Sequence, residues 1–127
     1  MGVNKFQLRK DIFDYFKSNL TNVDVAPEHP LGTSSTNPKI VISLIRDQAA
    51  GAIVNPLETN PEIQITCYTN KELELTKPNG LMYQVESLMS NFNPGYNFHK
   101  IKDIYVGYVP DVLLYCNYLI YRFYSQG

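Results

Sequence analysis

The sequence predicts an α+β domain of two layers, in which a mainly antiparallel sheet carries two helices packed on one face. Three observations lead to this prediction. Two segments place apolar residues at three- and four-residue spacing, which is typical of amphipathic helices. Several other segments alternate, or are apolar and rich in β-branched residues, which is typical of strands. The order is helix, strands, helix, strands, and no repeat or linker divides residues 1–127, so we expect a single domain.

The first helix is predicted over residues 5–20, where Leu8, Ile12 and Phe16 recur on one side among charged neighbours. A short extended piece follows at 23–26. The next stretch, PEHPLGTSSTNP, contains three prolines and a run of small polar residues, so it cannot continue a helix or a strand. We therefore expect a long exposed loop over 27–38.

The middle of the chain predicts strands. KIVISLIR at 39–46 is apolar on both faces, and the small residues after Asp47 are expected to turn back alongside it. EIQITCYT at 62–69 alternates, with Ile63, Ile65 and Cys67 on one side, which indicates a half-buried strand.

A second helix is predicted after Pro78, with Asn79 as its N-cap. Its apolar stripe consists of Leu81, Val85, Leu88, Met89 and Phe92. Asn93-Pro94-Gly95 ends it, and two further strands are expected at 101–109 and 113–124, separated by a turn at Pro110 and Asp111.

The last strand contains LYCNYLIYRFY, a run of aromatic residues with a single cation. Alternation places Leu119, Tyr121 and Phe123 on one face, and Tyr118, Ile120, Arg122 and Tyr124 on the other. Because both faces are largely apolar, we expect the helices to cover the first and another chain to cover the second. Tyr118, Arg122 and Tyr124 are therefore the candidate residues of a seam between subunits.

The residues that usually carry chemistry are sparse. The chain has two histidines, His29 and His99, each expected in an exposed loop, and two cysteines, Cys67 and Cys116, each within an apolar strand and expected to be reduced and buried. This is too few ligands at too wide a spacing for a metal site, and no glycine loop for phosphate occurs. We therefore predict no catalytic residue, no metal and no cofactor.

Charge and hydropathy exclude other classes of partner. The 11 Lys and Arg against 12 Asp and Glu give a net charge of -1, which disfavours binding to a long polyanion and predicts no sequence-specific nucleic-acid binding. No segment has the length and apolar character of a membrane helix, and the first residues lack the apolar core of a signal peptide. We expect a soluble protein that is made in the cytoplasm.

The loops predicted at 27–38, 47–61 and 69–79 are long for so small a domain, and long ordered loops are often functional. Lys71, Glu72 and Glu74 are typical of a solvated turn. The candidate residues for partner contacts in and beside these loops are Glu28, His29, Arg46, Asp47, Lys71, Glu72 and Glu74.

The whole layout resembles the tail terminator proteins of long-tailed bacteriophages. The resemblance lies in the opening helix FQLRKDIFDYFKSNL, the strand IVISLIRD, the strand PEIQITCYT with the helix GLMYQVESLMSNF after it, and a closing strand that ends in NYLIYRFYSQ. It covers nearly the whole chain. Members of this family are small α+β subunits, and the family has no invariant motif that would assign a catalytic residue.

The resemblance implies a structural role in the virion, at the junction of head and tail, after assembly in the host cytoplasm. It implies a homo-oligomer, a ring of six, that caps the tail tube protein, stops its polymerisation and offers its other face to a head completion or stopper protein. DNA would pass through the ring. Two alternatives stay open: another head–tail connector or minor tail protein of similar build, and a small ligand-binding domain or enzyme with a pocket between sheet and helices.

Overall fold

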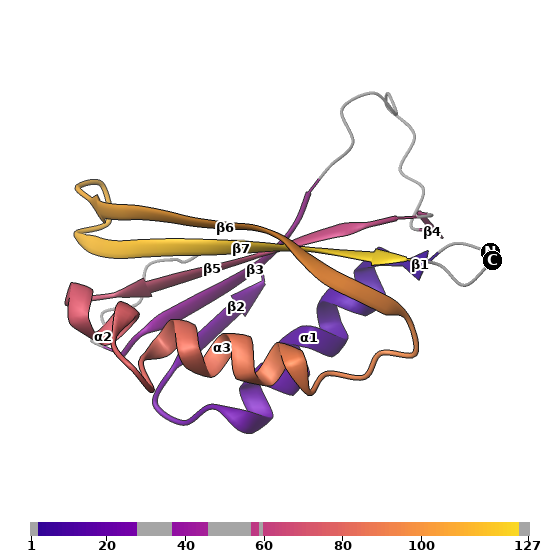
Figure 1. Cartoon of the computed structure of the whole chain (residues 1–127), viewed down its shortest axis with the longest axis horizontal. Helices are drawn as coiled ribbons and strands as arrows, with labels where there is room; N and C mark the ends of the chain where they lie inside the picture. Colours follow the sequence, from indigo (N-terminus) through magenta and orange to yellow (C-terminus); the bar gives the residue numbers. More distant parts are fainter. Residues whose placement is uncertain (1–2, 28–36, 46–56, 59, 125–127) are drawn as a thin grey trace.

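A computed structural model describes residues 3–27, 37–45, 57–58 and 60–124 of the chain. Its main sheet has five strands in the order β2 (Asp24–Pro27), β3 (Lys39–Leu44), β5 (Glu62–Thr69), β7 (Leu114–Tyr124) and β6 (Asn97–Val109). A small antiparallel pair joins β1 (Val3–Asn4) to β4 (Leu57–Glu58). Figure 1 shows the helices together on one side of the main sheet. The predicted two-layer α+β class is confirmed.

The first helix, α1 (Lys5–Asn19), begins where the Asn4 side chain accepts a hydrogen bond from the backbone N–H of Gln7 at 3.1 Å. This N-cap satisfies one of the backbone donors that a helix start leaves unpaired. Leu8, Ile12 and Phe16 are buried against β2 and β3, as their spacing predicts. The helix ends one residue earlier than predicted, at Asn19.

The second predicted helix is α3 (Leu81–Ser90), which buries Leu81, Val85 and Met89. Its N-cap is Gly80 and not Asn79, so that prediction is wrong. A Cβ added to Gly80 would lie 2.7 Å from the backbone oxygen of Glu74 and 2.8 Å from that of Lys77. The chain enters the helix through a gap that only glycine fits.

A short third helix, α2 (Glu72–Thr76), lies within the segment predicted as the loop 69–79. Its Leu75 is fully buried, and the helix packs on α3 and on the ends of β5 and β7. Five residues are too short to show helical periodicity, and the single buried leucine anchors this turn through tertiary packing.

The centre of the sheet is β5 between β3 and β7, antiparallel to both. Leu119 of β7 lies opposite Ile65 of β5, and both are fully buried beneath the helices. Tyr121 and Phe123 belong to the same core, so the predicted inner face of the last strand is confirmed. At one edge β2 pairs with β3 in parallel, which makes the sheet mixed rather than wholly antiparallel.

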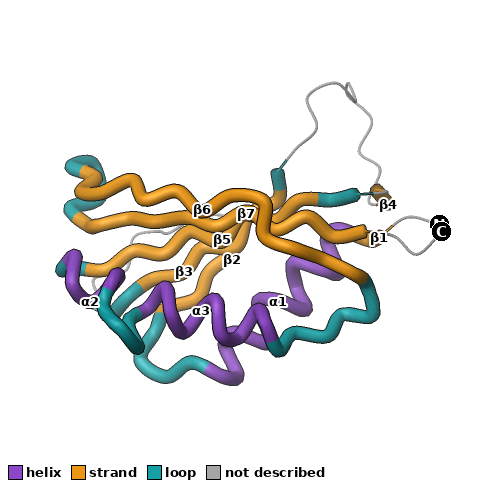
Figure 2. Tube along the Cα trace, viewed as in Figure 1, coloured by secondary structure: helices purple, strands orange, loops and turns teal. Residues whose placement is uncertain are grey.

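The other edge is β6, which begins at Asn97, earlier than predicted, and runs beside β7 as the long hairpin seen in Figure 2. Its ladder is interrupted between Lys100 and Lys102 and between Tyr105 and Gly107. Gly107, with φ +89°, adopts the left-handed conformation that suits a bulge.

Candidate functional site

The structure separates the predicted partner-contact residues into two groups. Glu28, His29, Arg46 and Asp47 lie outside the described residues. Lys71, Glu72 and Glu74 lie at the start of α2 rather than in an irregular turn, with Lys71 as the N-cap residue. Glu72 accepts a hydrogen bond from the hydroxyl of Tyr105 on β6, which raises the pKa of Tyr105 to about 12. This contact ties α2 to the hairpin.

The predicted seam residues Tyr118, Arg122 and Tyr124 all lie on the face of β7 opposite the core, which we call the outer face. Arg122 already has a partner in its own chain. Its Nε and Nη2 donate to one carboxylate oxygen of Glu62 at 2.9 and 2.7 Å, across the β5–β7 pair. The hydrogen bonds to Glu62 are the main reason that the pKa of Arg122 is raised. These two hydrogen bonds hold the Arg122 side chain against the neighbouring strand β5.

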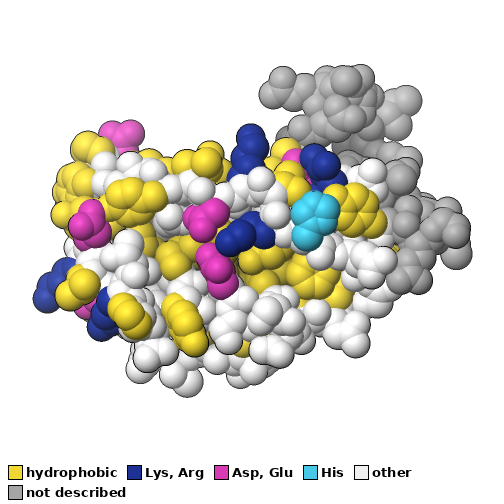
Figure 3. All heavy atoms as spheres, in the orientation of Figure 1, with side chains coloured by type: hydrophobic (Ala, Val, Ile, Leu, Met, Phe, Trp, Pro, Cys, Tyr) yellow, Lys and Arg dark blue, Asp and Glu magenta, His cyan; other side chains and the backbone are white. Residues whose placement is uncertain are grey.

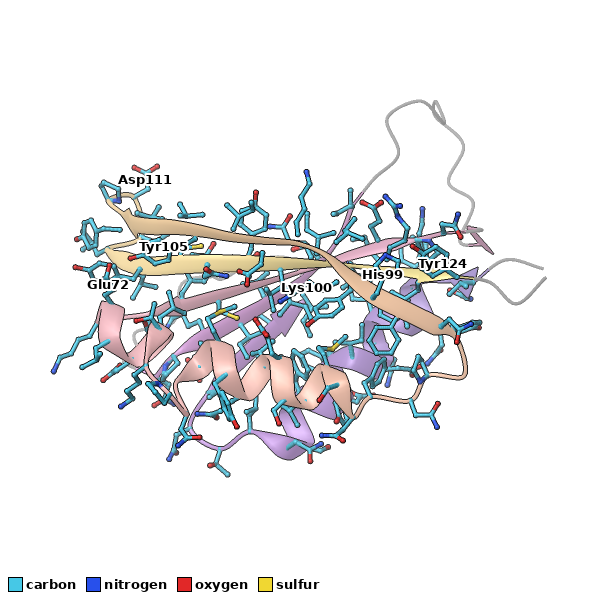
Figure 4. All side chains as sticks on the ribbon, in the orientation of Figure 1. Glu72, His99, Lys100, Tyr105, Asp111 and Tyr124 are labelled. Atoms are coloured by element: carbon cyan, nitrogen blue, oxygen red, sulfur yellow. The ribbon has the colours of Figure 1, made fainter. Side chains whose placement is uncertain are left out.

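Tyr124 forms a second fixed contact at the same end of the ribbon. Its ring stacks on His99 of β6 with centroids 5.1 Å apart, and its hydroxyl lies 3.1 Å from Nε2 of His99. Figure 4 shows this pair at the opposite end of the hairpin from Asp111. His99 was predicted in a loop, but it lies within strand β6.

No described helix covers the outer face, yet its middle is apolar. Ile120 is only 7% exposed there, because neighbouring strands and their side chains surround it. Ile104 and Tyr118 face each other across β6 and β7, and Lys102 lies opposite Ile120. We call Lys102, Ile104, Tyr118 and Ile120 the outer-face patch.

A second apolar surface lies at the turn between β6 and β7. Of the nine exposed large hydrophobic residues in the described part of the chain, six lie within 104–113, so exposure is concentrated on this hairpin. Figure 3 shows hydrophobic side chains gathered at that end of the molecule. We define the tip patch as Val106, Tyr108, Asp111, Val112 and Leu113.

The tip contains an unusual backbone conformation. Leu113 has φ +58°, the left-handed region that normally favours glycine or asparagine, and its side chain is 68% exposed. The backbone oxygen of Val109 accepts from the N–H groups of Val112 and Leu113 at 3.3 and 2.9 Å, which closes the turn. A leucine here adds backbone strain and buries little, so the fold alone does not explain its presence. The run VGYVPDVLL, apolar through a turn, is the sequence signal that could have identified this surface.

A polar network connects the helix layer to β6. Lys100 lies 3.3 Å from a carboxylate oxygen of Glu86 on α3 and 3.6 Å from Asp103. The amide of the buried Asn117 donates to Asp103 at 3.0 Å. These groups satisfy one another, and no buried polar side-chain atom among the described residues lacks a partner. The network therefore supports the edge strand and leaves no group aimed at a ligand.

The two cysteines are free and buried, on opposite faces of the sheet. Burial raises the pKa of both thiols, that of Cys116 to about 11. A protonated, buried thiol is a poor nucleophile. Within the described residues, no group of three or more His, Cys, Asp or Glu side chains is placed to hold a metal ion.

No described helix is both long enough and apolar enough to cross a membrane. No known protein-family model matches the chain, and no curated protein matches its sequence. The site is therefore defined by its geometry: two apolar surfaces, the outer-face patch and the tip patch, on one long hairpin.

Proposed function

We propose that this chain is a structural subunit of a bacteriophage tail terminator: a ring, expected to contain six copies, that caps the tail tube and stops its growth. The observation that carries the proposal is the concentration of exposed hydrophobic residues on the β6–β7 hairpin. Exposed apolar patches of this kind are typical of protein–protein contact surfaces.

The composition of the described surface supports an assembly role over a chemical one. The ionisable groups that meet in space, such as Glu62 with Arg122 and Glu86 with Lys100, neutralise each other. The net charge of -1 suits a subunit that surrounds DNA without gripping it. In this proposal one end of the ring binds the tail tube protein and the other a head completion or stopper protein, within the virion.

The proposal is tested by polymerising the cognate tail tube protein with and without this chain, and measuring tube lengths by electron microscopy. We expect added protein to bind at tube ends and to halt elongation at a stoichiometry far below one chain per tube subunit. Tubes that grow equally long in its presence, with no protein at their ends, would contradict the function. Tail length in phage that lack the gene gives an independent measurement.

A further inference from the structure

The two apolar surfaces of the hairpin lie at different places on the same subunit. Leu113 lies immediately before β7 and precedes Tyr118 by five residues, or about 16 Å of extended chain. When one patch of each subunit binds a different patch of the next, head to tail, the contact is heterologous, and such a contact builds a ring when its rotation closes. A closed ring therefore requires the kind of surface pair that this hairpin offers.

Charge distinguishes the two patches. Asp111 at the tip is exposed and forms no ion pair with any described residue, and Figure 4 shows it projecting from the end of the hairpin. Lys102 in the outer-face patch is exposed and likewise has no ion-pair partner in the described part of the chain, whereas neighbouring Lys100 is bound to Glu86 and Asp103. An acid beside apolar side chains on one patch and a base beside apolar side chains on the other are complementary.

The edge of β6 favours side-chain docking over the addition of a strand. Bulges interrupt the ladder at two places, and charged residues lie between them. These are devices that prevent a second strand from pairing with a sheet edge. The tip, in contrast, carries the strained and exposed Leu113, which an incoming surface would bury.

We infer that a second copy of this chain is the occupant of the outer-face patch: the tip patch of one subunit docks on the outer-face patch of the next, with Asp111 paired to Lys102 of the neighbouring copy. This inference rests on the proposed ring and names its seam. Val112 and Leu113 then pack against Ile104, Tyr118 and Ile120, and the rest of each subunit stays free for the tube and the neck.

Charge reversal tests the inference without tail tubes. Sedimentation velocity at high protein concentration would compare the wild-type chain with Asp111→Lys, Lys102→Glu and the double variant. Each single reversal brings like charges together, so we expect association to weaken about tenfold or more, and the double variant to recover it. The matched control is Asp11→Lys, the same charge reversal at an exposed residue of α1 outside both patches, and this variant should associate like the wild type.

Mixing the two single variants tests whether the tip of one subunit meets the outer-face patch of another. In the head-to-tail contact, the reversed tip of the Asp111→Lys variant meets the reversed patch of the Lys102→Glu variant, and these charges are again opposite. The other contact in the mixture joins an unchanged tip to an unchanged patch, so an equimolar mixture should assemble although neither variant does alone.

A tip-to-tip contact would place Asp111 opposite Asp111, so Asp111→Lys would exchange one pair of like charges for another and Lys102→Glu would have no effect; association that does not respond to Lys102→Glu would overturn the inference. A wild-type chain that stays monomeric throughout, or a mixture that fails to assemble, would also overturn it. The growth of tail tubes separately decides the proposed function.

Discussion

Replacing Leu119 with alanine tests the assignment of the two faces of β7. Leu119 is fully buried, opposite Ile65 on β5, in the core beneath the helices. The substitution removes about three carbon atoms from this core, a transfer loss of roughly 2.4 kcal/mol at about 0.8 kcal/mol for each methylene-sized group. The cavity left in a rigid sheet raises the expected loss to about 3–4 kcal/mol.

The measurement is equilibrium urea unfolding followed by circular dichroism, with Tyr118→Ala as the matched control. Tyr118 is adjacent in sequence but lies half-buried on the outer face, so we expect its loss to lower the free energy of unfolding by about 1 kcal/mol, the typical effect of a substitution. Tyr118→Ala should weaken self-association more than it weakens folding. A Leu119→Ala loss below about 1 kcal/mol, or equal losses for the two variants, would refute the assignment of faces.

Three further predictions concern backbone, turn and thiols. Gly80→Ala should destabilise by about 1–3 kcal/mol in thermal unfolding, because the added Cβ meets two backbone oxygens, whereas Ser90→Ala at the exposed end of α3 should change stability by less than about 0.5 kcal/mol. Leu113→Gly should raise the free energy of unfolding by about 0.5–1 kcal/mol by relieving the left-handed conformation, yet weaken self-association; a loss of stability would show that Leu113 serves the isolated fold. At pH 8 both thiols should react with a thiol reagent at least about tenfold more slowly in the folded than in the unfolded chain, because burial raises the pKa of each. For the same reason the free energy of unfolding should fall as the pH rises above 9.0, the ordinary pKa of a thiol. Equal reaction rates in the two states would contradict the burial of the thiols.

Local patterns predicted the layers of this fold because they report directly on burial. The spacing of Leu8, Ile12 and Phe16 indicated the buried side of α1, and alternation along β7 correctly placed Leu119 in the core. The cap of α3 was predicted wrongly. Asn79 has suitable capping chemistry, but the close approach of the Glu74 and Lys77 backbones to Gly80 depends on a turn of tertiary structure.

The features that define the site depend on contacts distant in sequence. Arg122, a candidate seam residue, has a carboxylate partner within the chain that the sequence pattern did not reveal, because Glu62 lies 60 residues away and is brought opposite it by strand register. The parallel pairing of β2 with β3 and the contact between Tyr105 and Glu72 also arise from topology. The tip patch lies in and beside the predicted turn at Pro110 and Asp111, and the exposure of its side chains depends on how the hairpin packs in the fold.

The central claim is that this chain acts as a ring of subunits at the end of a tail tube. The most direct measurement is the number of copies bound at each tube end, counted by stepwise photobleaching of a singly labelled chain and compared with averaged end views from electron microscopy. The account predicts six copies in a closed ring at one end of the tube. Binding along the tube wall, single copies at the ends, or no binding would contradict it.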